Sequence, residues 1–256
     1  MKGFFKYIGT ITISMLREMG QMMMLFLEAL SWLFRPPFRV RLFFKQMEFI
    51  GVNSLFVVML TSLFTGMVLA LQTYYAFKMF SAETLVGATV ALSMTRELGP
   101  VITGLMVTGR AGSAICAEIG TMRVTEQVDA LTVMAIDPVQ YLVLPRVLAG
   151  LIVMPLLTIV SDVMGILGGY IVGVKVLGIH GGLFMNKIYE FVELGDVYNG
   201  LIKASVFGVI LTLVGCYKGF YTGGGAEGVG RSTTQAVVMA SVLILVSDYI
   251  LTALMF

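Results

Sequence analysis

The chain of 256 residues is 58% hydrophobic and only 12% charged, and its mean hydropathy is +0.93. A soluble domain normally carries about 25% charged residues, so the composition excludes an ordinary soluble protein and predicts an all-α integral membrane protein with several spans. The formal net charge of +2, without a basic run interleaved with aromatic residues, excludes a nucleic-acid-binding protein.

Residues 1–48 mix basic, aromatic and apolar side chains, and Pro36-Pro37 interrupts their apolar clusters. This mixture is typical of a helix that lies in the membrane interface, where aromatic rings and long basic side chains both find favourable surroundings. We therefore expect an N-terminal interfacial segment over 1–48 and a membrane domain over 49–256. Seven of the 17 Lys and Arg residues lie in the first segment: Lys2, Lys6, Arg17, Arg35, Arg39, Arg41 and Lys45.

Five apolar stretches of the membrane domain reach the ~20 residues that a transmembrane helix needs. With the N-terminus in the cytoplasm, twelve Lys and Arg residues lie on the cytoplasmic side and four on the outer side, and the C-terminus is outside. The expected spans are 49–77, 84–112, 144–175, 197–218 and 233–255. The four outer residues are Lys78, Lys175, Lys187 and Lys203.

The second span contains two adjacent charges, Arg96 and Glu97, and Pro100 follows shortly after them. Both charges lie midway between Glu83 and Arg110, near the bilayer centre, where each costs about 2.5–3.5 kcal/mol on insertion scales. Pro100 has no N–H to donate to the carbonyl of residue 96. That acceptor is therefore freed, and a kink is favoured at this point.

The helix face that carries Glu97 is otherwise small or polar, which permits close approach of another helix or forms the wall of a cavity. From the residues alone two interpretations stay open: a packed interface with a buried ion pair, or a polar spot on a substrate path. The residues of this face are Ser93, Glu97, Pro100, Gly104, Thr108 and Ala111.

The polar connection over 113–143 is the longest in the chain and falls on the cytoplasmic side. Its apolar residues Val124, Val128 and Leu131 recur at helical spacing, so we expect one amphipathic helix that Asp137-Pro138 ends. A solvated connector and a docking surface for a partner protein are both open on this pattern.

The remaining spans carry further polar or small residues. Gly165, Gly169 and Gly173 form two overlapping GxxxG motifs, which predict a helix-packing seam in the third span. Asp162 and Asp248 are single intramembrane acids, and the sequence shows no evident partner for either one.

The sequence offers no pattern for a nucleotide, cofactor or metal site. His180 in the outer loop 176–196 is the sole histidine, which favours a surface residue over a metal ligand. Cys116 and Cys216 lack CxxC spacing, which predicts buried free thiols without redox chemistry. The glycine-rich stretch 221–231 lacks the GxxxxGK[ST] pattern, and no Walker A sequence occurs elsewhere.

Seven short motifs follow one another between about residue 50 and the C-terminus: Gly66–Gln72, Ser81–Thr84, Arg96–Pro100, Gly109–Ala114, Ala117–Gly120, Met122–Gln127 and Leu251–Phe256. As a set, in this order and spacing, they resemble the MlaE family. Its members are permease subunits of ABC transporters that move phospholipids between bacterial membranes. Residues 1–48 match mainly in character, and Asp162 is not part of the pattern.

The resemblance implies a homodimer in the bacterial inner membrane. Each subunit would have an interfacial helix, five transmembrane helices, a cytoplasmic coupling helix and a short periplasmic helical loop, with its N-terminus cytoplasmic and its C-terminus periplasmic. Two copies of a separate ABC ATPase would hold ATP and Mg, and a periplasmic MCE-domain protein would bind substrate. A small cytoplasmic accessory subunit is a further partner. The chain itself would be a non-catalytic permease that contributes to outer-membrane lipid asymmetry.

The resemblance also assigns residues to sites. The family's lipid cavity falls at the charged pair, so lipid binding is implied for Glu97, Arg96, Phe80, Tyr75, Leu69 and Leu71. The segment Ala117–Ala135 resembles the coupling helix that seats in the ATPase, with Glu118, Arg123, Glu126 and Asp129 as its polar residues. Pro100 and Gly104 are the expected kink and packing positions of the second span.

Two other classes of function remain open on the residues themselves. A proton-coupled secondary carrier would use the intramembrane acids and would need no ATPase. An intramembrane lipid-modifying enzyme would use Glu97 or the aspartates as catalytic acids, although the sequence offers no nucleophile–base pair to accompany them. Co-purification with a nucleotide-binding subunit separates the carrier from the ABC permease.

Overall fold

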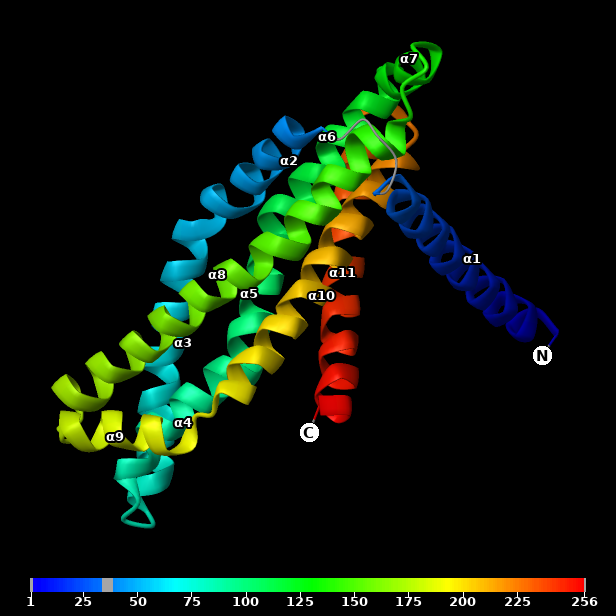
Figure 1. The fold of residues 1–256 in the computed structure, drawn as a ribbon. Helices are drawn as coiled ribbons and strands as arrows, with labels where there is room; N and C mark the ends of the chain where they lie inside the picture. The colour runs from blue at the N-terminus through cyan, green and yellow to red at the C-terminus, as the bar shows by residue number, and fades with distance from the viewer. Residues whose placement is uncertain (1, 34–38, 256) are drawn as a thin grey trace.

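The computed structural model describes residues 2–33 and 39–255, which are helical almost throughout and include no strand. Figure 1 shows long helices side by side in one elongated bundle, from which helix α1 (Lys2–Trp32) diverges. The Pro36-Pro37 interruption lies outside the described residues.

In the described part of the chain, ten α-helices follow α1. The long ones are α3 (Asn53–Lys78), α8 (Leu144–Tyr170), α10 (Leu194–Phe220) and α11 (Gly225–Met255). The shorter ones are α2 (Val40–Met47), α4 (Val86–Ser93), α5 (Gly99–Val107), α6 (Ser113–Val124), α7 (Gln127–Val133) and α9 (Gly181–Phe191). Intervening turns are the 3-10 turn η2 (Glu83–Leu85) and the π-helical turns η1 (Glu48–Val52), η3 (Met94–Leu98), η4 (Thr108–Gly112), η5 (Val139–Val143) and η6 (Ile171–Val176).

Four continuous helices within the described residues are long and apolar enough to cross a membrane, as in an integral membrane protein. The helical rod over 86–124, formed by α4, η3, α5, η4 and α6, is not one of the four; it contains Arg96, Glu97 and Arg110. The first of the four begins inside the segment expected to be interfacial, because α2 continues through η1 into α3. The four are Val40–Lys78, Val139–Val176, Leu194–Phe220 and Gly225–Met255.

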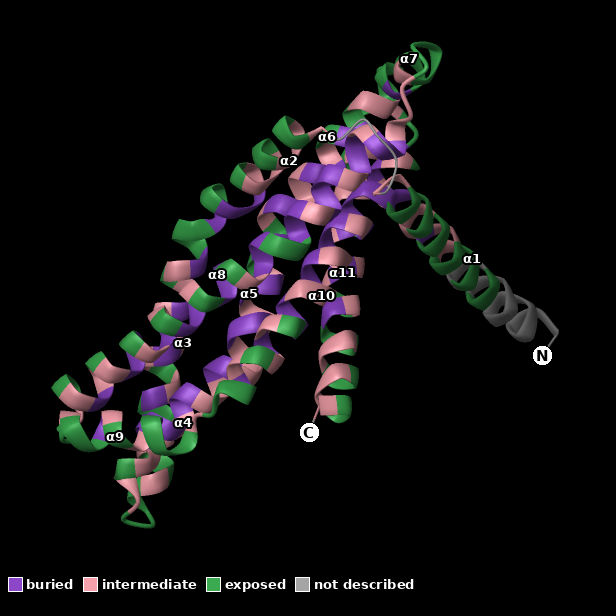
Figure 2. Cartoon of the chain, viewed as in Figure 1, coloured by how far each residue is buried: buried purple, intermediate pink, exposed green. Residues whose placement is uncertain are grey.

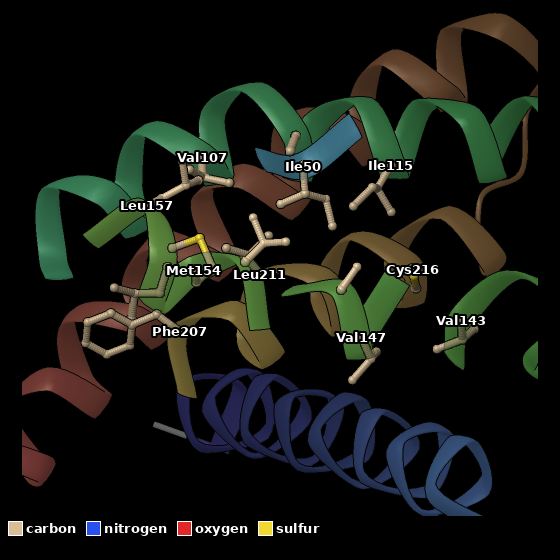
Figure 3. Packing of buried hydrophobic residues seen from close by; sticks show 14 of the residues in the cluster. Ile50, Val107, Ile115, Val143, Val147, Met154, Leu157, Phe207, Leu211 and Cys216 are labelled. Atoms are coloured by element: carbon tan, nitrogen blue, oxygen red, sulfur yellow. The ribbon is translucent and has the colours of Figure 1, made fainter. Parts of the chain in front are cut away.

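The main core lies inside the bundle, where α8 and α10 meet the rod and the first apolar helix. Figure 3 shows Ile50, Val107, Met154, Phe207 and Leu211 converging there, and all five are buried. Figure 2 shows the buried residues running along the inside of the bundle. Large apolar side chains also cover much of the outer surface, which is the surface that a lipid environment, not water, requires.

Glycine lets α3 and α8 approach until their backbones touch. A Cβ added to Gly66 would lie 1.8 Å from the carbonyl oxygen of Gly165, which is far inside van der Waals contact. This direct backbone contact is the kind of packing that small residues permit between transmembrane helices. The other two motif glycines face side chains, with an added Cβ 2.7 Å from Val90 at Gly169 and 2.9 Å from Phe184 at Gly173.

Replacing Gly66 with alanine is expected to lower the free energy of unfolding by about 1–3 kcal/mol, because the methyl group overlaps a backbone carbonyl. The measurement is the melting temperature of the purified protein in detergent. Gly20→Ala is the matched control, because nothing lies within 4 Å of a Cβ there and alanine favours the helix. Equal changes in the two variants would contradict the close α3–α8 contact.

The connection over 113–143 contains two short helices, so the expectation of one amphipathic helix is wrong. Helix α6 ends at Val124, and Glu126 adopts a left-handed φ of 60° before α7 begins. This break turns the chain so that Val128 is buried, whereas the apolar spacing alone fits an uninterrupted helix equally well. Figure 1 shows α7 at the tip of the bundle.

Asp137-Pro138 begins a helix, so the expectation that it ends one is also wrong. The Asp137 carboxylate accepts hydrogen bonds from the backbone N–H groups of Val139 at 2.8 Å and Gln140 at 3.0 Å, where η5 starts. An acidic cap followed by proline is a signal for a helix start, because proline has no N–H to leave unpaired. The preceding helix ends at Val133.

At the opposite end of the bundle, α9 packs against α4 (Figure 1). Its Phe184 is fully buried, and a Cβ added to Gly87 of α4 would lie 2.7 Å from the Phe184 carbonyl oxygen. The segment that the sequence predicts as an outer loop therefore contains a packed helix. His180 is exposed, and Cys116 and Cys216 are free and buried, as the sequence predicts.

Candidate functional site

The rod departs from α-helical geometry at its two adjacent charges. Residues Met94–Leu98 form the π-helical turn η3, and the N–H of Gly99 bonds to the carbonyl five residues earlier. Pro100 has no N–H, so the Arg96 carbonyl lacks its usual helical donor. Lys203 Nζ donates to that carbonyl at 3.0 Å, which confirms the predicted free acceptor. A π-helical turn of this kind is frequent at functional sites.

Lys203 of α10 is the buried centre of a polar cluster, which we call the Lys203 cluster: Lys203, Glu97, Asp248 and Thr252. Its side chain has no solvent exposure, and its ammonium donates to Glu97 Oε2 and to Thr252 Oγ1, each at 2.7 Å. Asp248 Oδ1 lies 3.3 Å from the same nitrogen. The Thr252 hydroxyl lies 3.1 Å from Glu97 Oε1, to which it donates. These contacts join the rod, α10 and α11 at one point.

Arg96 has a different partner from Glu97. Its Nε lies 2.7 Å from Asp196 Oδ1, and the same carboxylate forms a capping box with Glu193 at the start of α10. Adjacent residues on a helix point about 100° apart, so the two charges reach two points along α10. Exposed fractions of the side chains are 39% for Arg96 and 36% for Glu97. Both therefore keep an accessible edge, and exposure does not favour one over the other.

Three carboxylates and two cations form the ion pairs at the turn η3: Glu97, Asp248 and Asp196 with Arg96 and Lys203. If all five were ionised, these ion-paired groups would carry two positive and three negative charges, a net charge of −1. No group of three or more His, Cys, Asp or Glu side chains in the described ranges is placed to hold a metal ion. What this arrangement offers chemically is charge and hydrogen bonding inside an apolar bundle.

Lys203 and Asp196 are functional candidates that the sequence patterns did not reveal. Counting charges for the positive-inside rule put Lys203 on the outer side, whereas the structure shows the residue wholly buried within α10. Asp248, for which the sequence shows no partner, lies beside it. Charge balance is the sequence signal that could have pointed to Lys203, because two intramembrane acids such as Glu97 and Asp248 require a cation nearby.

Asp162 of α8 also reaches the turn η3. A Cβ added to Gly99 would lie 1.8 Å from Asp162 Oδ1, so a larger residue there would force the carboxylate to move. Asp162 is buried, and Oδ1 has no hydrogen-bond partner among the residues that the structure describes. The preceding Ser161 bonds to Ser62 of α3 at 2.7 Å, which fixes α8 against α3 at this level. The turn is thus in contact with both α8 and α10.

The small face of the rod packs against α10 and α11. A Cβ added to Gly104 would lie 3.4 Å from Phe207 and 3.5 Å from Ile244, which is ordinary contact. Pro100 is buried, and a Cβ added to Gly200 of α10 would lie 3.5 Å from its ring. Around Pro100 and Gly104 the face is therefore a packed interface, whereas the side chains of Arg96 and Glu97 stay partly exposed.

An apolar groove of about 490 Å³ lies beside η3. Leu98, the residue after Glu97, forms one wall, and five residues of α3 form the other: Phe64, Thr65, Val68, Leu69 and Gln72. Three further residues expected to bind lipid do not line this groove and are exposed at the bundle surface, with exposed fractions of 39% for Leu71, 62% for Tyr75 and 79% for Phe80.

The four residues implied for the ATPase contact lie at the α7 end of the bundle. Glu118 Oε2 lies 2.8 Å from Nη2 of the buried Arg146, which attaches α6 to α8. Arg123 pairs with Asp129 and closes α6 onto α7. Glu126 is exposed at the turn between the two helices. Helices α6 and α7 are therefore held to the bundle by ion pairs while the turn remains accessible.

Comparison with known proteins identifies the family. The family model described as "Permease MlaE" matches residues 43–254. An intermembrane phospholipid transport system permease protein of Haemophilus influenzae is 43% identical over 256 residues, covering 99% of this chain and 97% of the relative. A probable ABC transporter permease protein of Rickettsia bellii is 50% identical, covering 97% and 96%. The chloroplast protein trigalactosyldiacylglycerol 1 of Arabidopsis thaliana is 40% identical, covering 83% and 61%. The chain therefore belongs to the MlaE permease family, as its motifs predict.

Proposed function

We propose that this chain is the membrane-spanning permease of an ABC transporter that moves phospholipids between the inner and outer membranes of a bacterium. It would thereby contribute to the lipid asymmetry of the outer membrane. Family membership supports the permease role, and the name of the Haemophilus relative supports phospholipid as the cargo. In this proposal the permease has no catalytic role, because ATP and Mg bind to two copies of a separate ATPase subunit.

The observation that carries the proposal is that the turn η3 carries both accessible charges and a wall residue of an apolar groove. A phospholipid has a charged headgroup and apolar chains, so a path for it needs both kinds of surface at one place. Glu97 and Arg96 supply accessible charge, and the following residue, Leu98, lies in the groove wall with Leu69. We propose that the headgroup passes the two charges while the chains pass the groove.

The proposed topology has five spans, with the rod over 86–124 as the fifth membrane-crossing helix beside the four apolar ones. The N-terminus lies in the cytoplasm of the bacterial inner membrane, and the C-terminus lies in the periplasm. A second copy of the chain covers the apolar face of α11, where large side chains are exposed at helical spacing. These are Val238, Val242, Leu245 and Tyr249.

The α7 tip is the proposed seat for the ATPase, with a small accessory subunit on the same cytoplasmic side. Val133 is 88% exposed, and Met134 beside it is also exposed, which is the apolar surface that a protein partner covers. On the periplasmic side, an MCE-domain protein would contact the α9 end, where Tyr189 and Leu194 are exposed. ATP binding and hydrolysis would move α7 and the α6 end of the rod, and the Glu118–Arg146 ion pair would pass this movement to α8.

Charge reversal at the tip is expected to weaken ATPase binding. Glu126→Lys changes an exposed residue in the turn and should raise the dissociation constant of the ATPase about tenfold, the ratio that ~1.4 kcal/mol gives. The measurement is titration of the ATPase onto the permease in nanodiscs, together with lipid-stimulated ATP hydrolysis. Glu190→Lys on α9, at the other end of the bundle, is the matched control. Unchanged binding in Glu126→Lys would place the contact elsewhere.

The function itself is tested by purifying the chain with its ATPase and measuring ATP-dependent phospholipid transfer from proteoliposomes. The alternative is a proton-coupled carrier, which the ionisable groups around Lys203 favour, because intramembrane acids and bases also form proton relays. A carrier would move lipid in response to a proton gradient without any ATPase. Transfer by the permease alone, driven by pH and unaffected by ATP, would therefore overturn the ABC permease proposal.

A further inference from the structure

A second apolar cavity, of about 200 Å³, lies where the end of α1 meets the starts of α2 and α8. Its walls include Trp32, Phe43 and Leu148, and its polar lining comes from Arg39 and Gln140. A cavity of ~150 Å³ lined by Leu, Ile and Phe holds a benzene molecule. This cavity therefore has room for part of a hydrocarbon chain. None of its lining residues belongs to the Lys203 cluster or to the groove beside η3.

Arg39 is held in place by stacking. Its guanidinium lies 4.5 Å from the centre of the ring of Tyr141. Tyr141 directly follows Gln140 in the chain. Stacking occupies the face of a guanidinium and leaves the N–H groups at its edge able to donate. Among the residues that the structure describes, no carboxylate forms an ion pair with this guanidinium. An anion can therefore approach its edge.

The charge around the cavity is positive. Arg39, Arg41 and Lys45 lie in or next to α2, and the first acidic residue after them is Glu48. None of the three cations has an ion-pair partner in the described ranges. The arrangement is thus complementary to an anion whose remainder is apolar.

Two acids lie on the neighbouring segments, and neither pairs with Arg39. The Asp137 carboxylate accepts hydrogen bonds from the backbone at the start of η5. Burial raises the pKa of Glu28, and the Asp137 charge raises it further.

We propose that this cavity binds a phospholipid with an anionic headgroup, whose phosphate contacts Arg39 and whose acyl chain enters between Phe43 and Leu148. Guanidinium and phosphate form paired hydrogen bonds with favourable charge, which lysine does not reproduce. In the proposed topology the cavity faces the cytoplasmic leaflet, where anionic lipids attract basic segments. This lipid is resident between α1, α2 and α8 and is distinct from the lipid that passes the Lys203 cluster.

The chain contains a single tryptophan, Trp32, and it lines this cavity. Its fluorescence is therefore a direct reporter of what occupies the cavity. The full-length protein is reconstituted in phosphatidylcholine vesicles that contain either brominated phosphatidylglycerol or brominated phosphatidylcholine at equal mole fraction. Bromine quenches tryptophan only at short range, so the ratio of the two quenching curves gives the preference for the anionic headgroup. We expect about a fivefold preference, as one cationic side chain at an anionic surface provides.

Two pairs of variants locate the effect. Arg39→Gln should abolish the headgroup preference, whereas Arg41→Gln, on α2 but outside the cavity lining, should retain it. Leu148→Phe should reduce quenching by filling the cavity, whereas Leu151→Phe on the exposed side of α8 should not. Circular dichroism of each variant verifies that it remains folded.

Equal quenching by the two brominated lipids would overturn the proposal. Loss of preference in Arg41→Gln to the same extent as in Arg39→Gln would overturn it too, because the effect would then be general surface attraction. Unchanged quenching in Leu148→Phe would show that no acyl chain occupies the cavity. Transport plays no part in these measurements, so their outcome is independent of the proposed function.

Discussion

Replacing Lys203 with methionine is expected to abolish phospholipid transport and to lower the free energy of unfolding by about 3–5 kcal/mol. The side chain is fully buried, and its loss leaves the Glu97 and Asp248 carboxylates without their cation in an apolar bundle. Leaving a buried charge without its partner is among the most destabilising changes that a single substitution makes. The measurements are the melting temperature in detergent and ATP-dependent lipid transfer by the complex with its ATPase.

A compensated variant separates stability from transport. Removing both carboxylates as well, with Glu97→Gln and Asp248→Asn added to Lys203→Met, should restore most of the lost stability, because no buried charge remains unpaired. Transport should stay abolished, because the headgroup then meets no charge in the cluster. Lys187→Met is the matched control, since its ion pair with Glu190 is exposed on α9 and such pairs contribute less than about 1 kcal/mol. Restored transport in the compensated variant would show that the Lys203 cluster has only a structural role.

Replacing Gly99 with alanine is expected to destabilise the permease by about 1–3 kcal/mol and to displace the turn η3. The new methyl group would overlap the Asp162 carboxylate, whose Oδ1 lies 1.8 Å from the added Cβ. Since η3 carries Arg96 and Glu97, its displacement should also reduce lipid transfer. Melting temperature and transfer rate are the two measurements.

The reciprocal substitution gives this prediction a control. Asp162→Ala removes the overlapping oxygen, so the double variant Gly99→Ala/Asp162→Ala should be more stable than Gly99→Ala alone. Such non-additivity is expected only of residues in contact. Gly109→Ala on the same rod, where nothing lies within 4 Å of a Cβ, should have little effect. Strict additivity of Gly99→Ala and Asp162→Ala would show that the two residues do not touch.

Some features of the site follow from local covalent chemistry and could therefore be predicted from sequence. Pro100 lacks an N–H in any fold, so the Arg96 carbonyl had to find another donor. Glycines four residues apart on an apolar helix predict close packing wherever the partner lies, and Gly165 meets the backbone of α3. The family was likewise predictable, because its motifs lie in one fixed order.

Other features depend on tertiary contacts between distant segments and could not be predicted in the same way. Lys203 lies more than a hundred residues from Glu97 in sequence, and only the folded bundle brings them to 2.7 Å. The helix break at Glu126 could not be predicted from periodicity, because the apolar spacing on both sides of it fits one helix. The dipeptide Asp137-Pro138 can end one helix or begin the next, depending on which backbone N–H groups donate to its carboxylate.

The most direct test of the lipid path is photocrosslinking from the groove wall at the turn η3. A photoreactive amino acid replaces Leu98, which lines the groove, or Met106, an exposed residue of the same rod that does not line it. In the reconstituted complex with its ATPase, residue 98 should form phospholipid adducts whose yield changes during ATP hydrolysis, while the yield at residue 106 stays constant. Equal, nucleotide-independent yields at the two positions would contradict a lipid path past Glu97.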